Sequence, residues 1–149
     1  MGQQTDAFVL TDDASEPESP AAASLSGRKL RRCVGCVRCL TETPGKCAIK
    51  DGFPEISERI MGFETLEIHS AAYENGFSPM MTKAIERLSN ELQAFTDMGG
   101  AIPLSKDSVK LRNIRVIMRG IPGNREEFEL ETLKNLRIGP VEEVYFEYR

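Results

Sequence analysis

Several features that assign a sequence to a common functional class are missing from this chain of 149 residues. No apolar run is long enough to cross a bilayer, and the first residues, Met1–Asp6, are polar, so neither a membrane span nor a signal peptide is expected. The motifs GxSxG, HExxH and GxxxxGKS are absent, which leaves no assigned catalytic residue. The net charge of -4 and the pI near 5.2 argue against a dedicated nucleic-acid-binding protein. We therefore expect a cytoplasmic protein whose partners include neither a membrane nor a nucleic acid.

Histidine is also scarce, because His69 is the only one in the chain. It ends a predicted strand, and we expect it to be a structural residue rather than a catalytic base. The length of the chain predicts a single domain, residues 1–149, with a core of ordinary size. Within it, residues 11–27 are rich in Ala, Ser, Pro and Glu without periodicity, which predicts a flexible loop or linker.

All four cysteines of the chain lie within the fifteen residues 33–47. Cys33, Cys36 and Cys39 are three residues apart, and a Pro-Gly turn just before Cys47 returns the chain to them. This spacing is typical of an iron–sulfur cluster held by four thiolates; a tetrahedral zinc site and disulfides or free thiols are the alternatives. In a reducing cytosol, a metal centre is favoured over a disulfide framework. We therefore expect a 4Fe-4S cluster on this cysteine loop, with zinc as the alternative metal.

Four basic residues precede the first cysteine: Arg28, Lys29, Arg31 and Arg32. A basic run of this kind is usually a solvent-exposed face. Cations beside thiolates also lower the pKa of the thiols and offset the negative charge of a thiolate-ligated cluster. The run therefore has a structural and a functional interpretation, and an acidic partner or a nucleotide phosphate would fit the functional one.

Strand-like and helix-like hydrophobic patterns alternate along the rest of the chain. The patterns predict strands at Ala7–Leu10, Glu64–His69, Asn113–Arg119 and Val141–Tyr148. They predict helices from Pro54, from Phe77 to about Phe95, and from the Asn124–Glu127 capping pair to Gly139, with a loop at 96–110. This alternation is typical of an α/β protein in which a parallel sheet of about four strands lies between helices in three layers.

Two segments resemble the flavodoxin-like NAD(P)H-dependent FMN reductases and iron–sulfur flavoproteins. The first is Cys-Val-Gly-Cys-Val-Arg-Cys-Leu-Thr-Glu-Thr-Pro-Gly-Lys-Cys-Ala-Ile-Lys-Asp at 33–51, and the second is Ser-Ala-Ala-Tyr-Glu-Asn-Gly-Phe-Ser at 70–78 with the helix residues 83–87. The similarity extends from about residue 30 to the C-terminus. It implies a flavodoxin-like fold, a cluster on the four cysteines and an FMN whose ring lies against Ser70, Tyr73, Asn75, Gly76 and Phe77.

The chain also departs from this family. A flavodoxin-like chain begins with a strand and a Ser/Thr-rich loop that holds the FMN phosphate at a helix N-terminus. Here the nearest segment, 11–19, carries four carboxylates that would repel a phosphate. We therefore place Ala7–Leu10 as the second strand of the family and expect the first strand, which lies inside the sheet, to be missing with its phosphate loop. Another chain in a hetero-complex, or a second copy in a homo-oligomer, would then supply the strand.

Two functions of different classes follow. In the first, the chain is a redox protein or subunit that transfers electrons through FMN, the four-cysteine site, or both; if it is an enzyme, it is an NAD(P)H-dependent flavin oxidoreductase. In the second, it is a non-catalytic structural or interaction subunit with a degenerate flavin site and a structural zinc or cluster. Ala71-Ala72 and Glu74, which depart from the usual flavin-ring loop, favour the second function, whereas the four retained cysteines favour the first.

Overall fold

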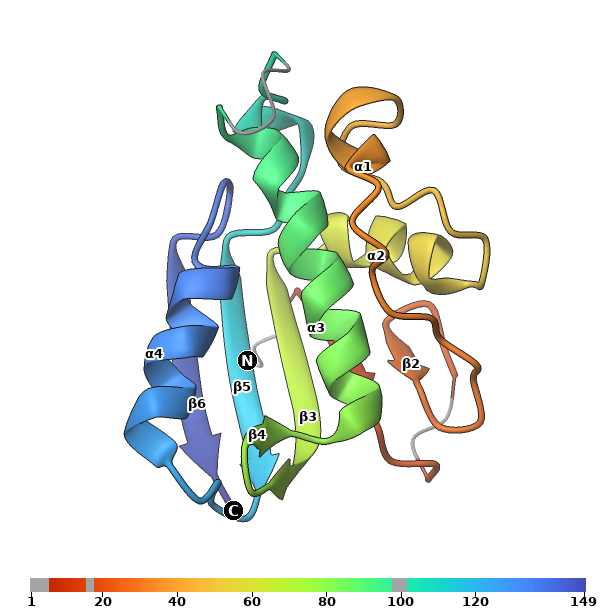
Figure 1. Ribbon diagram of the computed structural model, residues 1–149. Coiled ribbons are helices and arrows are strands. Elements are labelled where there is room, and N and C mark those ends of the chain that lie inside the picture. Colours follow the sequence, from red (N-terminus) through yellow and green to blue (C-terminus); the bar gives the residue numbers. More distant parts are fainter. Residues whose placement is uncertain (1–5, 16–17, 98–101) are drawn as a thin grey trace.

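The computed structural model describes residues 6–15, 18–97 and 102–149. Its centre is a sheet in which five strands run parallel in the order β2-β1-β3-β5-β6 (Figure 1). A short sixth strand, β4, pairs antiparallel with the end of β3. The strands are β1 (Ala7–Thr11), β2 (Ala22–Ser24), β3 (Thr65–Tyr73), β4 (Gly76–Phe77), β5 (Asn113–Arg119) and β6 (Glu143–Tyr148).

The three helices that the sequence predicts begin within two residues of their expected starts. Pro54 lies in the first turn of α2, the hydroxyl of Ser78 accepts a hydrogen bond from the N–H of Met81 at the start of α3, and Asn124 caps α4 by accepting from the N–H of Glu127. The helices are α1 (Arg38–Thr41), α2 (Phe53–Met61), α3 (Pro79–Leu92) and α4 (Arg125–Leu136), with 3-10 turns η1 (Gln93–Phe95) and η3 (Lys106–Ser108).

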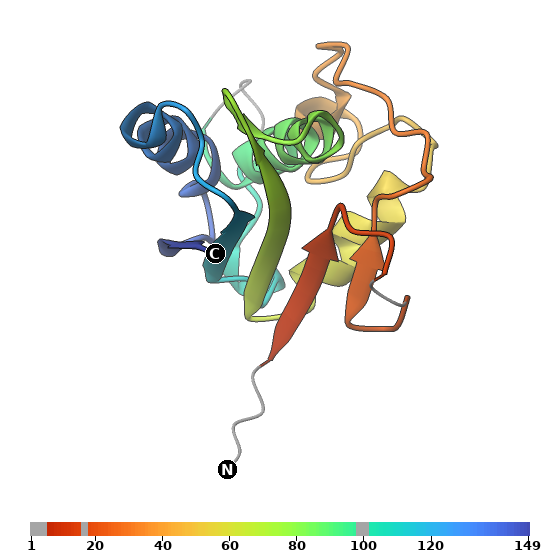
Figure 2. The ribbon, with the colours of Figure 1, turned by 90° about the horizontal axis from the view of Figure 1, so that it is seen from below.

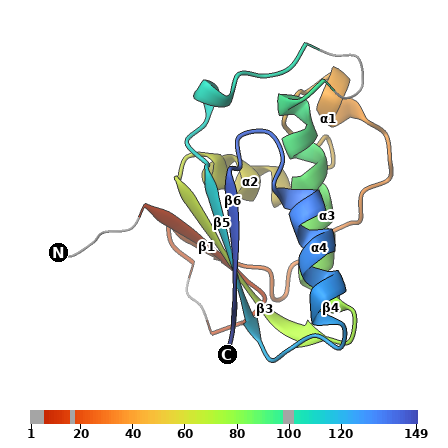
Figure 3. The same ribbon diagram turned by 90° about the vertical axis from the view of Figure 1, so that its left-hand side faces the viewer.

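One face of the sheet carries the hydrophobic core. Leu66, Ile68, Ile114 and Val116 alternate along β3 and β5 and are fully buried against the helices. Figure 3 shows α2, α3 and α4 on the same side of the sheet. The crossovers from β2 to β3, from β3 to β5 and from β5 to β6 all proceed in one direction along the sheet, so right-handed connections put their helices on one face. The described residues therefore form two layers, not the three that we expected.

The opposite face of the sheet is polar. The carboxylate of Glu67 on β3 accepts hydrogen bonds from Arg115 on β5 (3.0 Å) and pairs with His69 (3.1 Å), while Tyr145 on β6 is half exposed. These charged and aromatic side chains explain why no helix has to cover this face. Glu67 and His69 therefore face this uncovered side of the sheet.

The place of β1 in the sheet corrects the sequence analysis. The strand predicted at Ala7–Leu10 is present, but it pairs with β2 on one side and with β3 on the other. It is therefore the internal first strand, and the prediction that this strand is missing is wrong. The order of the parallel strands is the one typical of flavodoxin-like sheets. What differs is the connection from β1 to β2, which has no helix among its described residues.

The segment at 11–27 is also more ordered than a linker. Its residues 22–24 form β2, which pairs in register with Val9–Thr11. Three residues without alternating polarity are too short a pattern to recognise in the sequence. Residues 1–5, 16–17 and 98–101, the last in the loop predicted at 96–110, lie outside the described residues. None of the described helices combines the length and the apolar character that crossing a membrane requires.

Candidate metal centre

The cysteine loop, residues 33–47, connects β2 to α2 and contains the short helix α1. Gly35 and Gly45 have positive φ angles of 73° and 82°, and Val37 at the start of α1 has a φ of 51°. These left-handed residues turn the backbone back on itself. As a result one small cavity beside α3 is lined by all four cysteines, Cys33, Cys36, Cys39 and Cys47. Figure 1 shows the α1 region close to the C-terminal half of α3.

Helix α3 provides the groups that anchor the loop. The carboxylate of Glu86 accepts a hydrogen bond from the N–H of Cys33 (3.3 Å), and that of Glu91 accepts from the N–H of Cys47 (2.7 Å). Between them, the side-chain amide of Asn90 donates to the sulfur of Cys33 (3.1 Å). The first and last cysteines are thus fixed to the same helix.

Arg87 is the buried cation of this site. Its side chain is fully buried, and its guanidinium donates to the sulfur of Cys47 (3.3 Å) and to the carboxylate of Asp51 (2.5 Å). It also donates to the main-chain oxygens of Arg31 (3.2 Å) and Ile49 (3.3 Å). Because Arg31 precedes the first cysteine and Ile49 follows the last, one guanidinium holds both ends of the loop.

Asp51 fixes the chain where the loop joins α2. Its carboxylate accepts hydrogen bonds from the main-chain N–H groups of Arg31 (2.9 Å) and Phe53 (3.2 Å) as well as from Arg87. Burial alone would raise the pKa of Asp51, but these donors outweigh it and hold the pKa below its usual value. The pair of Asp51 and Arg87 is therefore ionised at neutral pH.

The charges around the sulfurs fit a cationic centre. Burial raises the pKa of the Cys39 thiol to about 11, and the neighbouring carboxyl of Glu91 and the other cysteines add to this. Metal ligands must be thiolates, so four of them in one cavity require more positive charge than Arg87 supplies. Hydrogen bonds to sulfur, such as those from Arg87 and Asn90, also tune the potential of a cluster. The kinds of donor present therefore suit a thiolate-ligated metal centre. The four thiols would have to move closer together to share one, because no three His, Cys, Asp or Glu side chains of the described residues are near enough to hold a single metal ion.

Two buried polar atoms of this site have no hydrogen-bond partner among the described residues: Nε of Arg87 and Oε1 of Glu91. Burial raises the pKa of Glu91 to about 7, although the N–H of Cys47 opposes the shift. Unsatisfied buried groups are rare in folded proteins and mark places where the packing serves more than stability.

The residues that the family resemblance assigns to a flavin ring lie elsewhere. The hydroxyl of Ser70 is buried; it accepts from the N–H of Ser78 (3.1 Å) and donates to the carbonyl of Ala71 (2.9 Å). Phe77 packs edge-on against Phe128, with ring centroids 5.0 Å apart. The hydroxyl of Ser70 and the ring of Phe77 are therefore already engaged in contacts with other residues of the chain.

The other three residues of that set lie at the turn between β3 and β4. Tyr73 and Asn75 are exposed there, and Gly76 is buried with a φ of 128°. A Cβ at Gly76 would lie 2.7 Å from the ring of Phe128, so packing alone requires glycine. From the start of α3 near this turn to Glu86, which bonds the N–H of Cys33, the helix rises about 10 Å. Arg32, just before the first cysteine, lines a second pocket together with Tyr73, Asn75 and Phe77. The structure thus gathers the four cysteines around one cavity and places this turn on another pocket.

Asp12 occupies the carboxyl end of β1, where a flavodoxin-like chain binds phosphate. Its carboxylate accepts hydrogen bonds from the hydroxyl of Ser78 (2.5 Å), the N–H of Ala71 (3.0 Å) and the guanidinium of Arg119. Burial raises its pKa, but these donors outweigh it, so the pKa of Asp12 is below its usual value. An ionised carboxylate on these donors, with Asp13 next to it, would repel a phosphate dianion. The residues present do not fit the phosphate of FMN.

Comparison with known proteins identifies no relative: no family model matches the chain, and no curated protein matches its sequence. The fold and the site therefore define the class on their own, an α/β protein in which a four-cysteine loop is fixed to one helix of a singly covered sheet.

The sequence analysis found the cysteines but not the residues of α3 that hold them. The analysis predicted this helix from the pattern of its apolar residues, and the structure confirms that these residues are buried. Arg87 and Glu91 stand at the same helical spacing as the buried Ala84 and Leu88. A charged residue at the spacing of an apolar stripe is expected to be buried, and a buried charge needs a partner. This pattern in the sequence would have identified Arg87 and Glu91 as residues that bind another part of the chain.

Proposed function

We propose that this chain is an electron-transfer protein that holds an iron–sulfur cluster on Cys33, Cys36, Cys39 and Cys47. The observation that carries the proposal is that these four side chains line one cavity. Such a cluster, when bound, takes up and releases single electrons. The electron comes from a reduced redox protein and goes to an oxidised one, and neither the fold nor the sequence restricts these partners further.

The chain's own residues have separate roles in this proposal. Asn90 and Arg87 donate hydrogen bonds to two of the sulfurs and so stabilise the thiolate forms. Asp51 keeps Arg87 in place and balances its charge. At the outer side of the cavity Val34, Cys36 and Val37 are exposed, which leaves one edge of the site open to a redox partner.

Flavin chemistry is not part of this proposal. Asp12 takes up the hydrogen-bond donors at the carboxyl end of β1 that would otherwise be available to the phosphate of FMN. An NAD(P)H-dependent flavin oxidoreductase would therefore need its flavin in another chain.

Association with a second copy or another chain stays a prediction, but a missing strand no longer supports it because β1 is internal. Sedimentation of the purified chain measures it directly. A concentration-independent mass of 16.6 kDa would contradict it.

The test of the proposed function is anaerobic reconstitution with ferrous iron and sulfide, followed by a visible spectrum and metal analysis. We expect broad absorption near 400 nm and about four irons per chain, lost on reduction and regained on oxidation. Cys47→Ser should abolish stable incorporation. Val34→Ala, which changes an exposed side chain of the same loop, is the matched control and should load as the unchanged chain does.

A structural subunit with zinc is the second candidate. The observation in its favour is that Glu86 and Glu91 already tie the loop to α3, so a metal there would fasten one more point of the same contact. A colourless protein that retains one zinc and rejects iron under the same conditions would decide for this candidate and against electron transfer.

A further inference from the structure

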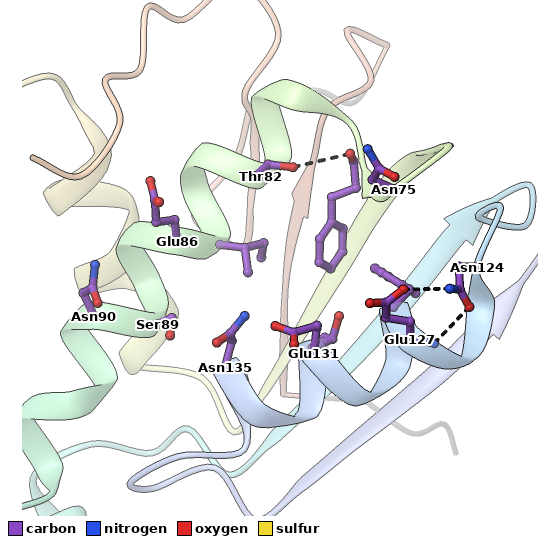
Figure 4. A pocket seen from close by; sticks show the side chains of 13 residues that line it. Asn75, Thr82, Glu86, Ser89, Asn90, Asn124, Glu127, Glu131 and Asn135 are labelled. Carbon is purple, nitrogen blue, oxygen red and sulfur yellow. Dashed lines mark hydrogen bonds between the residues drawn. The ribbon is translucent and has the colours of Figure 1, made fainter.

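A cleft of about 600 Å³ lies between α3 and α4, next to the cysteine site, with which it shares Glu86 and Asn90. Figure 4 shows Thr82, Glu86, Ser89 and Asn90 on the α3 side and the polar residues of α4 on the other. Its apolar surface comes from Phe77, Ile85 and Phe128. The residues that line it on α4 or just before it are Asn124, Glu127, Glu131, Thr132 and Asn135.

The charge of the cleft has one sign. Three carboxylates line it, and none of its lining residues is Lys, Arg or His. Glu86 is already engaged with Arg32 (3.6 Å) and Cys33. Glu127 receives a hydrogen bond only from Asn124 (2.6 Å), and Glu131 has only a distant contact of 3.8 Å with an exposed lysine. The cleft therefore repels anions and has carboxylates with free acceptor capacity.

Two buried hydroxyls give a second, independent indication of a ligand. Ser89 and Thr132 line the cleft and are only 8% and 3% exposed, and neither hydroxyl has a hydrogen-bond partner among the described residues. The two oxygens are not among the fully buried atoms without a partner, so they open onto the cleft, where a ligand can bond to them in place of water. Both hydroxyls can accept from an N–H group.

We propose that this cleft binds a linear aliphatic polyamine. Glu127 and Glu131 are four residues apart on α4, so their Cβ atoms are about 6 Å apart on one face of the helix, a spacing that two ammonium groups joined by a short methylene chain can match. The methylene groups lie over Phe77, Ile85 and Phe128, and the two phenylalanine rings also attract cations. The remaining N–H groups bond to the buried hydroxyls of Ser89 and Thr132. This site does not depend on the proposed function of the cysteines.

The test is calorimetric titration of the full chain with spermidine at low ionic strength. We expect one saturable site, and about a tenfold loss of affinity in Glu127→Gln and in Glu131→Gln, because each loses a charge-assisted hydrogen bond. Glu127→Gln keeps the capping geometry of α4. The matched control is Glu126→Gln, which removes an equal charge from the same helix outside the cleft and should bind as the unchanged chain does.

A second variant separates the cleft from general charge attraction. Thr132→Val removes a buried hydroxyl without changing shape or charge, and it should weaken spermidine binding several-fold while circular dichroism stays unchanged. Equal losses in Glu126→Gln and the two cleft variants would overturn the proposal, as would no binding. Binding of an oligolysine peptide without binding of spermidine would also overturn it and assign the cleft to a basic protein partner.

Discussion

At the scale of single residues, Arg87 is the side chain that connects the parts of the cysteine site. Its guanidinium touches a thiol, a carboxylate and two carbonyl oxygens, and it lies 4.8 Å from the ring centroid of Phe53. A fully buried charge survives only when its partners are in place. Arg87 therefore links the cysteine loop, α2 and α3 through one side chain.

Replacing Arg87 tests this link. Arg87→Met leaves the carboxylate of Asp51 nearly buried without its cation, and the free energy of unfolding should fall by about 3–5 kcal/mol. Urea denaturation measures it. Arg137→Met, at an exposed arginine after α4, is the control and should change the free energy by less than about 0.5 kcal/mol.

The double variant Arg87→Met/Asp51→Asn shows whether the pair is the cause. It should lose less free energy than the sum of the two single variants, because the unpaired charge is gone. Strict additivity would mean that Arg87 acts through its other contacts.

At the scale of elements, Asp12 joins the carboxyl ends of three strands to the start of α3. It follows β1, and its partners Ala71, Ser78 and Arg119 belong to β3, the cap of α3 and β5. The side chain is only 7% exposed. In a fold that leaves this edge free for a ligand, these donors would be available, whereas here a carboxylate of the chain itself occupies them.

Asp12→Asn should lower the free energy of unfolding at pH 7 by about 1.5–3 kcal/mol, the range for hydrogen bonds to a charged group. Because the pKa of Asp12 is lower in the folded state than its ordinary 3.8, its contribution is present above pH 3.8 and is lost as the pH falls through the folded value. The unchanged chain and the variant should therefore converge in acid. Urea titrations at pH 7 and near pH 3 measure both effects.

The control for this experiment is Asp13→Asn, because Asp13 is exposed and accepts only a local hydrogen bond from the N–H of Ser15. It should leave the stability at pH 7 nearly unchanged. A loss in Asp12→Asn that persisted undiminished near pH 3 would show that the carboxylate charge is not what holds the strands.

The elements also show where sequence reasoning succeeds. The segments of α3 and β5 were predicted within a few residues, because their packing follows their own hydrophobic pattern. α4 was predicted equally well from its capping pair and from the glycine that follows it. β2, β4 and α1 were missed since each has at most four residues, and their pairing or turns come from neighbours that are distant in the sequence. The internal place of β1 was missed for the same reason: a five-residue strand carries no mark of its position in a sheet.

At the scale of the whole molecule, charge is unevenly divided. Residues 28–50 contain seven basic and one acidic residue, a net charge of +6, so the rest of the chain carries -10 of the total of -4. The basic part includes the cysteine loop. Four of its cations are paired with carboxylates: Arg28 with Glu18, Arg32 with Glu86, Arg38 with Glu42 and Lys46 with Glu58. Charges farther away than about 10 Å are screened at ordinary ionic strength, so a molecule that approaches the cysteines meets an excess of cations smaller than +6, rather than the net negative charge of the chain.

This division predicts the sign of a salt effect. In the iron-loaded protein, oxidation by the anion hexacyanoferrate(III) should slow as ionic strength rises, although protein and oxidant both carry net negative charge. Stopped-flow absorption measures the rate. Arg31→Gln/Arg32→Gln should flatten the dependence, whereas Lys134→Gln/Arg137→Gln, which removes the same charge from the far side of the chain, should leave it unchanged. A rate that rises with salt would contradict the local-charge argument.

At the scale of the whole molecule, the sequence predicts the fold class but not which face of the sheet is covered. The alternation of strands and helices predicted the α/β class correctly. The cysteine spacing predicted four thiols around one metal; the four cysteines line one cavity, and the metal itself stays a prediction. The number of layers depends on the direction of each crossover. That direction is a property of strand order, which no local pattern in the sequence records.

The connection between β1 and β2, at residues 12–21, has a consequence for the design of variants. It is the one step that runs against the direction of the other crossovers, so a helix inserted there would cover the bare face without displacing α2, α3 or α4. Lengthening a loop costs only about 0.6 kcal/mol for each doubling. This connection is therefore the point at which a reporter or an additional helix can be built into the chain while the cysteine loop and its supporting helix stay as they are.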